Sequence, residues 1–204
     1  MILVGMLDSP YVRRCAVSMK LMGIPFEHRS LSVFRTFDQF RAINPVVKAP
    51  TLVCSDGAVL MDSTLILDYL ESQVTESRRL MPSHGIEHRE ALRLTGLALA
   101  GCEKCVQIVY EKTQRPEEKR HPPWLERVIG QANAAFVELE RDLEKAQPWL
   151  QGVKVTAADV AVACTWRFAQ HATADEVLAA KYPRLARHSE RAEALPEFAS
   201  TPLA

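Results

Sequence analysis

The segment 48–72 constrains the fold of this chain more than any other. Two short apolar runs flank the turn Ser55-Asp56-Gly57, a pattern that is typical of a β-hairpin. A helix over 64–72 is predicted directly afterwards, because the Ser63 hydroxyl can accept hydrogen bonds from the free N–H groups at its head. Pro50 opens the first strand of the hairpin, where its missing N–H is tolerated, in a trans or a cis peptide bond.

The N-terminal residues are predicted to form a strand, a helix and a second strand. An apolar strand over 2–7 precedes Asp8-Ser9-Pro10, which indicates a helix start because proline is favoured at the first helical position. The second strand, over 26–31, must run parallel to the first if both join one sheet, and a weaker helix over 37–43 follows. The apolar face of the first helix comprises Val12, Cys15, Ala16 and Met19, and its basic residues Arg13, Arg14 and Lys20 lie elsewhere.

The order of the predicted elements, β-α-β-α-β-β-α, indicates an α/β domain in which helices pack on a four-stranded mixed sheet. Polar and turn-forming residues then indicate a linker over 76–85. Beyond it, apolar residues recur every three to four positions over 92–109 and 125–143, which predicts two long helices. We therefore expect one domain over 1–75 and an all-helical domain over 86–204.

Thr156 and Asp159 have the spacing of a capping box, which predicts that a helix begins directly after Thr156. This helix should be buried as far as about residue 168, because the stretch 160–164 is apolar on every face. One further helix is predicted over 184–193.

Composition and charge narrow the function classes. The chain has 204 residues, of which 48% are hydrophobic and 25% charged, as in ordinary globular proteins. Its 25 basic and 25 acidic side chains cancel, which argues against a nucleic-acid surface or polybasic membrane binding. No apolar run reaches the roughly 18 residues that span a bilayer, and no basic leader precedes the first strand. Five cysteines in apolar surroundings favour a reducing compartment, so we expect a cytoplasmic protein.

Ser9 stands at the predicted head of the first helix, where unpaired N–H groups and the helix dipole favour a negative charge. A thiolate would be stabilised there, because a hydroxyl donor and a helix end lower the pKa of a thiol from its usual ~8.5. The alternative interpretation is that Ser9 only caps the helix.

Several motifs occur in a fixed order along nearly the whole chain. They are Ser9-Pro10 after the first strand, Asn44-Pro45 and Lys48-Ala49-Pro50 before the third strand, Asp62-Ser63 before the third helix, and the Thr156 to Asp159 box. This series resembles the cytosolic glutathione transferase family, and Ser9-Pro10-Tyr11-Val12-Arg13 is similar to a motif of its bacterial members.

The resemblance implies a thioredoxin-like N-terminal domain, an all-α C-terminal domain and a homodimer. It also implies that glutathione is joined to a hydrophobic electrophile, as in detoxification, without a metal. Val47 departs from the glycine that the family often has there.

The resemblance implies a glutathione site in the first domain. The Asp62 carboxylate would hold the ammonium of the γ-glutamyl end, and Ser63 with its N–H groups would hold the carboxylate, unless both residues only cap their helix. The N–H and C=O of Ala49, presented by Pro50, would pair with the cysteinyl backbone as an added strand does. Lys48 can approach the glycine carboxylate, although an exposed lysine is more often only solvated.

In this family the wall of the second-substrate site comes from apolar residues of both domains. Cys102-x-x-Cys105 has the spacing of a redox or half-zinc motif, but both cysteines lie on the apolar stripe of a long helix, which favours packing. The six histidines show no ligand spacing. A plain core or surface position is favoured for each candidate for the wall, and the candidates are Tyr11, Phe34, Cys105, Tyr110 and Trp166.

Three functions are compatible with the sequence. The first is an enzyme that activates glutathione through Ser9 for attack on an electrophile, or in a related lyase, isomerase or peroxidase step. The second is a glutathione-dependent thiol–disulfide oxidoreductase, which is disfavoured because Ser9 and Val12 occupy the positions of the two thiols. The third is a non-catalytic interaction protein that keeps the fold, against which the intact Asp62-Ser63 pair argues.

Overall fold

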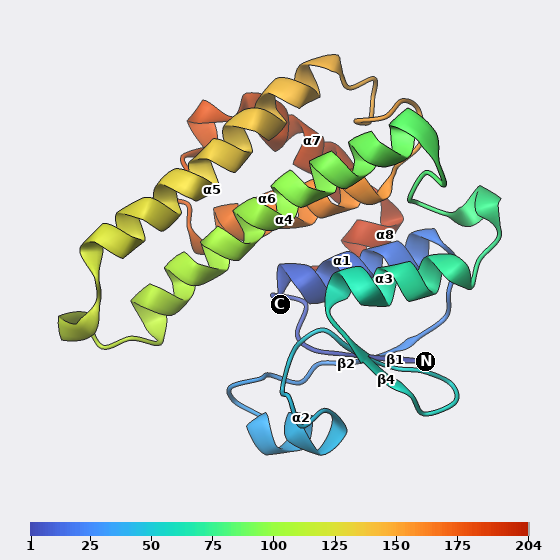
Figure 1. The fold of residues 1–204 in the computed structure, drawn as a ribbon, viewed down its shortest axis with the longest axis horizontal. Helices are drawn as coiled ribbons and strands as arrows, with labels where there is room; N and C mark the ends of the chain where they lie inside the picture. Colours follow the sequence, from blue (N-terminus) through green and yellow to red (C-terminus); the bar gives the residue numbers. More distant parts are fainter. Residues whose placement is uncertain (204) are drawn as a thin grey trace. The chain divides into compact units, whose positions relative to one another are not determined.

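The computed structural model describes residues 1–203, which divide into two compact units. The first unit comprises Met1–Met81 together with the segment that begins at Leu195, and the second comprises Pro82–Ala194. The first unit contains a sheet with helices, whereas the second is built from helices (Figure 1). This is the predicted combination of an α/β thioredoxin-like domain with an all-helical domain.

A sheet of four short strands forms the base of the first unit. The strands are β1 (Ile2–Val4), β2 (Glu27–Arg29), β3 (Thr51–Val53) and β4 (Val59–Met61). Their order in the sheet is β2-β1-β3-β4, with β1 parallel to β2 and antiparallel to β3. β3 and β4 form the predicted hairpin. Leu3 lies opposite Leu52 on the two central strands, and both side chains are fully buried.

β1 is shorter than predicted, because the strand ends before Gly5. Gly5 has a φ of 136°, a conformation that side chains other than glycine rarely adopt. A Cβ atom at Gly5 would lie 2.6 Å from Cγ2 of Val12 and 3.2 Å from Cβ of Ala49. Glycine therefore allows the first helix and the turn before β3 to approach the end of β1.

Three α-helices of residues 1–81 have bounds close to the predicted ones: α1 (Pro10–Leu21), α2 (Phe37–Ile43) and α3 (Ser63–Ser72). α1 buries the predicted apolar face, on which Val12, Cys15 and Met19 are fully buried. Arg13 and Arg14 lie outside this face, yet they are 1% and 4% exposed. Two consecutive arginine residues of the same helix are therefore buried.

The segment from Leu195 packs with the first unit, whereas the sequence assigns all of 86–204 to the helical domain. It contains the short helix α8 (Pro196–Ala199), in which Phe198 is fully buried. The guanidinium carbon of Arg13 lies 5.6 Å from the centre of the Phe198 ring, and its Nε donates to the Thr201 carbonyl at 2.8 Å. Arg13 thus attaches the segment to α1, which explains why this arginine is buried.

The second unit consists mainly of α4 (Gly85–Thr113), α5 (Pro122–Asp142), α6 (Ala157–Ala172) and α7 (Pro183–Glu193). α4 packs against α5 and α6, and α6 packs against α7. Residues 157–166 of α6 are all buried, because the helix has neighbours on several sides. Within residues 1–203 no helix is both long enough and apolar enough to cross a membrane.

α6 begins with the predicted capping box. Oδ2 of Asp159 accepts the Thr156 N–H at 2.9 Å and the Thr156 hydroxyl at 2.7 Å. Oδ1 of Asp159 accepts the Leu150 N–H at 2.9 Å. The buried carboxylate is therefore hydrogen-bonded through both oxygens, as a buried charge requires.

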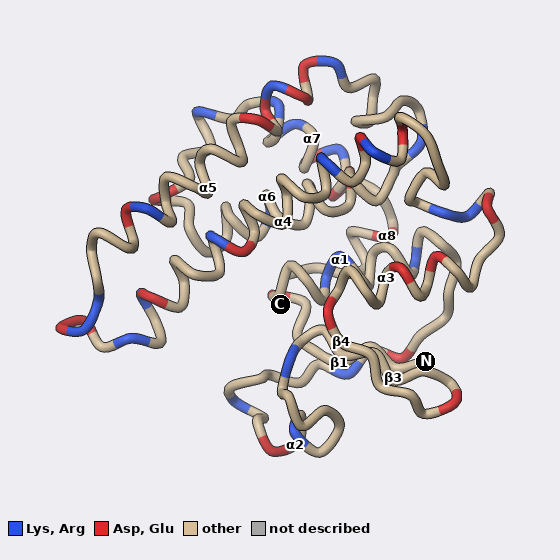
Figure 2. The backbone as a smooth tube through the Cα atoms, viewed as in Figure 1, with Lys and Arg blue, Asp and Glu red and all other residues tan. Residues whose placement is uncertain are grey.

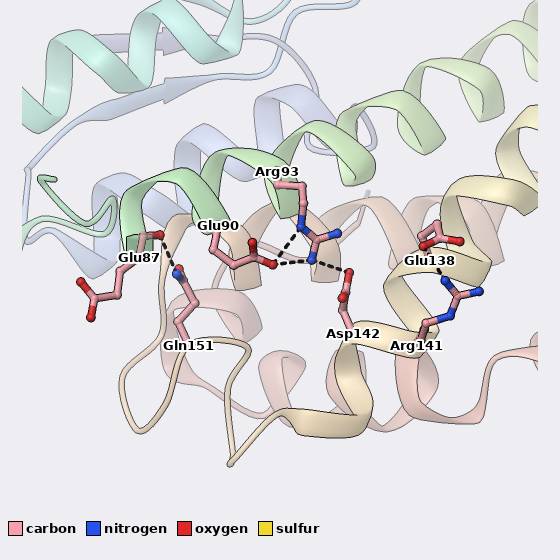
Figure 3. Close-up of polar contacts among 7 residues, drawn as sticks. All are labelled: Glu87, Glu90, Arg93, Glu138, Arg141, Asp142 and Gln151. Atoms are coloured by element: carbon pink, nitrogen blue, oxygen red, sulfur yellow. Dashed lines mark hydrogen bonds and ion pairs between the residues drawn. The ribbon is translucent and has the colours of Figure 1, made fainter. Parts of the chain in front are cut away.

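Polar contacts join the helices of the second unit at its surface (Figure 3). Arg93 of α4 lies between Glu90 of the same helix and Asp142 at the end of α5, with its Nη2 2.8 Å from Oδ2 of Asp142. The hydrogen bond to Glu90 raises the pKa of Arg93 above its ordinary value. Gln151 donates to the Glu87 carbonyl at 2.7 Å and ties a loop to α4. Exposed ion pairs contribute only about 0–1 kcal/mol each, so the apolar core provides most of the stability of this unit.

Charged side chains are distributed over both units (Figure 2). Basic and acidic positions occur in both units, and the sequence has no run of more than two consecutive residues of like charge. The zero net charge is therefore a property of mixed surfaces.

Candidate functional site

The sequence motifs fall on two helix heads and one turn of the first unit. α1 begins after Ser9, α3 begins after Asp62, and the turn 44–50 precedes β3. The two helices contact each other, since Nη1 of Arg14 on α1 lies 3.2 Å from the Ser63 hydroxyl on α3. The predicted site residues of this unit therefore come from segments that pack together.

Ser9 is the N-cap of α1. Its backbone is extended, with φ −71° and ψ 120°, and its Oγ accepts the Val12 N–H in a long hydrogen bond of 3.4 Å. Pro10 occupies the first helical position, where its missing N–H removes no hydrogen bond. Because the Ser9 oxygen is the acceptor in this contact, the hydroxyl proton can be donated to another group.

The turn before β3 is held by a short chain of hydrogen bonds. The Asn44 side-chain amide donates to the Thr51 hydroxyl at 2.8 Å, and this hydroxyl donates to the Lys48 carbonyl at 2.7 Å. Within the turn the Ala49-Pro50 peptide bond is cis, one of the two forms that the sequence allows. Ala49 is half-buried, and Lys48 is exposed.

Val47 adopts a left-handed backbone conformation in this turn, with a φ of 52°. A β-branched residue is rare in this region, because its Cβ crowds the next carbonyl at a cost of about 1–2 kcal/mol. The Val47 N–H donates to the Asn44 carbonyl at 2.9 Å, which fixes the conformation. A glycine would occupy this position without strain.

The N-cap of α3 is Asp62, and the sequence prediction that Ser63 caps this helix is wrong. Oδ1 of Asp62 accepts the Thr64 N–H at 2.9 Å. Asp62 has a φ of 72°, which aspartate tolerates better than most residues. Ser63 is the first helical residue, and its hydroxyl accepts a hydrogen bond from Arg14. Because helical geometry already begins at Ser63, the residue before it provides the cap.

Sequence reasoning missed the part of Arg14 in this arrangement. Nη1 of Arg14 contacts the Ser63 hydroxyl at 3.2 Å and the Thr64 hydroxyl at 3.4 Å. The only signal in the sequence is a pair of consecutive arginines one turn after Ser9-Pro10. An arginine outside the apolar face of a helix is expected at the surface by default, so the sequence alone does not predict that Arg14 is buried.

Three of the five residues suggested for the second-substrate wall have exposed surface. Phe34 is 54% exposed and Tyr110 is 46% exposed, whereas Tyr11 is half-buried. Tyr11 and Phe34 belong to the first unit, and Tyr110 lies on α4 of the second.

Cys105 and Trp166 lie in the apolar core of the second unit. The Trp166 ring meets the Phe136 ring edge to face, with their centroids 5.6 Å apart. Burial raises the pKa of the Cys105 thiol to about 11, so the thiol form is favoured at neutral pH. Cys102 is buried as well, which agrees with the packing interpretation of the Cys-x-x-Cys pair. Within residues 1–203 no group of three or more His, Cys, Asp or Glu side chains is placed to hold a metal ion.

Comparison with known proteins matches both units. A family model described as the N-terminal domain of glutathione S-transferase covers residues 3–78, and one described as the C-terminal domain covers 122–191. A solved glutathione S-transferase from Methylobacterium radiotolerans, in complex with glutathione sulfonate, is 28% identical with a TM-score of 0.90. The alignment covers 100% of this chain and 95% of that one.

Curated relatives include plant and bacterial proteins. Glutathione S-transferase U4 of Arabidopsis thaliana is 26% identical over 123 residues, which are 55% of this chain and 54% of the relative. The matched stretch thus spans about half the length of that relative. Maleylacetoacetate isomerase of Pseudomonas aeruginosa is 23% identical over 192 residues, covering 91% of this chain and 87% of the relative.

The fold is that of a thioredoxin-like domain joined to an all-helical domain, and the two family models match one domain each. The chain belongs to the glutathione transferase family. Glutathione is the co-substrate of this family, and solved relatives contain glutathione or glutathione sulfonate.

Proposed function

We propose that this chain is a glutathione-dependent enzyme, and specifically a transferase that activates the thiol of glutathione for attack on an electrophilic small molecule. The observation that carries the proposal is the position of Ser9 as the N-cap of α1, with its oxygen engaged by the Val12 N–H. Its hydroxyl proton is then directed to a further acceptor, and the helix head favours an anion nearby. A glutathione thiolate matches both properties.

In this proposal the two ends of glutathione are held away from the sulfur. Asp62 takes the ammonium of the γ-glutamyl end, and Ser63 takes its carboxylate. The backbone of Ala49 before the cis-Pro50 pairs with the cysteinyl residue, and Lys48 approaches the glycine carboxylate. These contacts would fix the sulfur at the head of α1 in both the ground state and the transition state.

The chemical step needs only a thiolate and an electrophile. The thiol loses its proton to solvent, and the anion is stabilised by the Ser9 hydroxyl and the first N–H groups of α1. The sulfur lone pair then forms a bond to an electrophilic carbon. In a substitution the leaving group departs with its bonding electrons, and in an addition the electrons of the broken π bond move to a neighbouring atom, which takes a proton from water. We propose that Tyr11 and Phe34 of the first unit contact the electrophile, because they have exposed or half-exposed aromatic surface.

Two measurements test this function. Retention on immobilised glutathione with elution by free glutathione tests binding, and a panel of electrophiles assayed with glutathione tests transfer. Saturable conjugation of at least one electrophile is the expected result. Retention without turnover on any electrophile would instead support a non-catalytic binding protein, and absence of retention would contradict the proposal as a whole.

An isomerase is the second candidate, because a relative that covers most of this chain is named maleylacetoacetate isomerase. In such a reaction the same thiolate would add to the substrate and leave again, so glutathione would not be consumed. Measuring glutathione consumption against product formation separates isomerisation from conjugation. A thiol–disulfide oxidoreductase is less well supported, since Ser9 has no sulfur to form a mixed disulfide.

We also propose a symmetric homodimer in the cytoplasm. Large apolar side chains are exposed on each unit, among them Leu65 of α3, which is 65% exposed, and Ile86 of α4, which is 72% exposed. Such side chains on both units suit the assembly of an N-terminal domain against the first long helices of a second copy. A solution mass about twice the 22.9 kDa of the chain is expected at micromolar concentration, and a monomer mass would contradict the dimer. Within residues 1–203 the five cysteines are buried and form no disulfide, which favours a reducing compartment.

A further inference from the structure

Arg14 carries a buried positive charge that no acidic side chain within residues 1–203 neutralises. Its side chain is 4% exposed, and its Nε has no hydrogen-bond partner within residues 1–203. The same residues contain no ion pair between Arg14 and an acidic side chain. A buried guanidinium normally has a carboxylate partner, because its removal from water is otherwise uncompensated.

The partners that Arg14 does have are two hydroxyl groups at the head of α3. Nη1 lies 3.2 Å from Oγ of Ser63 and 3.4 Å from Oγ1 of Thr64. A guanidinium can only donate, so the Ser63 oxygen must accept, and the hydroxyl proton is left for a different acceptor. Ser63 is thereby fixed as a hydrogen-bond donor.

Three sources of positive potential coincide at this point of the first unit. They are the charge of Arg14, the N–H groups at the head of α3 and the oriented hydroxyl of Ser63. Asp62 is the adjacent residue and adds a negative group beside them. One positive and one negative position on neighbouring residues match the carboxylate and the ammonium of an α-amino acid end group.

We propose that Arg14 is a positioning residue for the γ-glutamyl carboxylate of glutathione, and that it acts through the Ser63 hydroxyl. This inference rests on the proposed function and adds to it a residue of α1. The bound carboxylate supplies the counter-charge that the guanidinium lacks among the described residues. Arg14 therefore affects binding of the γ-glutamyl end and not the reactivity of the sulfur.

Two glutathione analogues separate this role from a purely structural one. The tripeptide 4-aminobutyryl-cysteinyl-glycine keeps the ammonium and lacks the γ-glutamyl carboxylate, whereas glutaryl-cysteinyl-glycine keeps this carboxylate and lacks the ammonium. Dissociation constants of glutathione and both analogues are measured by calorimetry for the wild type, Arg14→Met, Asp62→Asn and the exposed control Arg29→Met.

The predicted pattern depends on the ligand. Arg14→Met weakens glutathione and the glutaryl analogue by about 10- to 100-fold, the loss expected for a charge-assisted contact, and leaves the 4-aminobutyryl analogue unchanged. Asp62→Asn weakens the 4-aminobutyryl analogue and leaves the glutaryl analogue unchanged. Arg29→Met changes none of the three dissociation constants. Arg14→Lys, which keeps the charge without the planar fork, recovers part of the lost affinity for the glutaryl analogue. In steady-state kinetics Arg14→Met raises KM for glutathione with kcat nearly unchanged.

Equal weakening of all three ligands by Arg14→Met would show that Arg14 only packs α1 against α3, and would overturn the inference. If Arg14→Met does not fold, the same three titrations are made with Arg14→Lys, which keeps the buried charge. An equal loss of affinity for all three ligands in Arg14→Lys would then overturn the inference. A wild type that binds none of the ligands contradicts the proposed function itself, so the two failures are distinguishable.

Discussion

The Asp62 carboxylate accepts the Thr64 N–H at 2.9 Å and thereby caps α3. The same residue is proposed to hold the ammonium of glutathione. Its negative charge therefore affects glutathione binding, whereas its capping oxygen affects the stability of α3. An asparagine keeps a capping oxygen and also tolerates the left-handed φ of 72°, whereas an alanine keeps neither property. Two substitutions at Asp62 can therefore separate binding from stability.

We predict that Asp62→Asn weakens glutathione binding with little change in the unfolding free energy. The loss of a charge-assisted contact corresponds to about 1.5–3 kcal/mol of binding free energy. Since the contact is equal in the ground and transition states, KM should rise more than kcat falls. Calorimetric titration and steady-state kinetics measure both effects, and an unchanged affinity would remove Asp62 from the site.

Asp62→Ala should lower the unfolding free energy in addition to weakening binding. Loss of an N-cap typically costs about 1 kcal/mol, and alanine in a left-handed conformation adds strain. Urea unfolding of Asp62→Ala and Asp62→Asn gives the comparison. Equal stability of the two variants would mean that the 2.9 Å contact to Thr64 does not stabilise α3.

Val47→Gly should stabilise the fold or leave it unchanged, although glycine substitutions usually destabilise. Relief of the left-handed strain at φ 52° returns about 1–2 kcal/mol, against about 0.4–1 kcal/mol for the added freedom of the unfolded chain. Val46→Gly is the matched control, because Val46 is 59% exposed and does not have a positive φ. The control should lower the melting temperature. A clear loss of stability in Val47→Gly would show that its side-chain packing outweighs the strain.

The sequence predicts most elements of the first unit, and the start of α6 in the second, because local patterns determine them. α2 has the predicted bounds, the Asp56-Gly57 turn closes the hairpin, and the Thr156 to Asp159 box starts α6. Periodicity also identifies the apolar face of α1. These features depend on residues within a few positions of each other, which is the range that sequence patterns cover.

Features that depend on contacts between distant residues were not predicted. Arg14 and Ser63 are far apart in the sequence, so local patterns predict neither the burial of Arg14 nor its hydrogen bond to Ser63. The attachment of the segment from Leu195 depends in the same way on Arg13, which contacts Phe198 and Thr201. In both cases the sequence pattern shows an arginine outside an apolar face, and only the tertiary structure shows its partner.

His188 should make the stability of the fold depend on pH below neutrality. Burial lowers the pKa of His188 below its ordinary 6.5, against the opposing effect of Asp159, whose Oδ1 lies 3.7 Å from the imidazole Nε2. Between the folded and unfolded pKa values the unfolded chain binds more protons, so the unfolding free energy decreases as the pH falls below about 6.5. At higher pH the unfolding free energy should not depend on the protonation of His188.

His188 contributes at most about 1.4 kcal/mol per pH unit to the slope of the unfolding free energy against pH, the value for one proton. His188→Gln should reduce this slope below about pH 6.5, whatever its effect on stability at pH 8. The exposed His171 gives a control, because His171→Gln should leave the slope as it is. Parallel pH profiles for wild type and His188→Gln would contradict the assignment.

The Ser9→Ala substitution tests the proposed thiol activation. Ser9→Ala removes the acceptor of the Val12 N–H and should cost about 0.5–2 kcal/mol of stability through the lost N-cap. Glutathione affinity should change little, since the ends of the ligand are held elsewhere. Turnover should fall at neutral pH and recover partly at high pH, where the thiolate forms without help. Ser9→Thr keeps a hydroxyl and should behave like the wild type, and Ser9→Cys should move activity towards mixed-disulfide chemistry.

The most direct measurement is the ultraviolet absorbance of the thiolate of bound glutathione, titrated against pH in the wild type and in Ser9→Ala. The wild type should show a thiol pKa below the ~8.5 of an ordinary thiol, and Ser9→Ala should shift it upwards. Superimposable titrations of the two proteins would contradict the account, because Ser9 would then only cap α1.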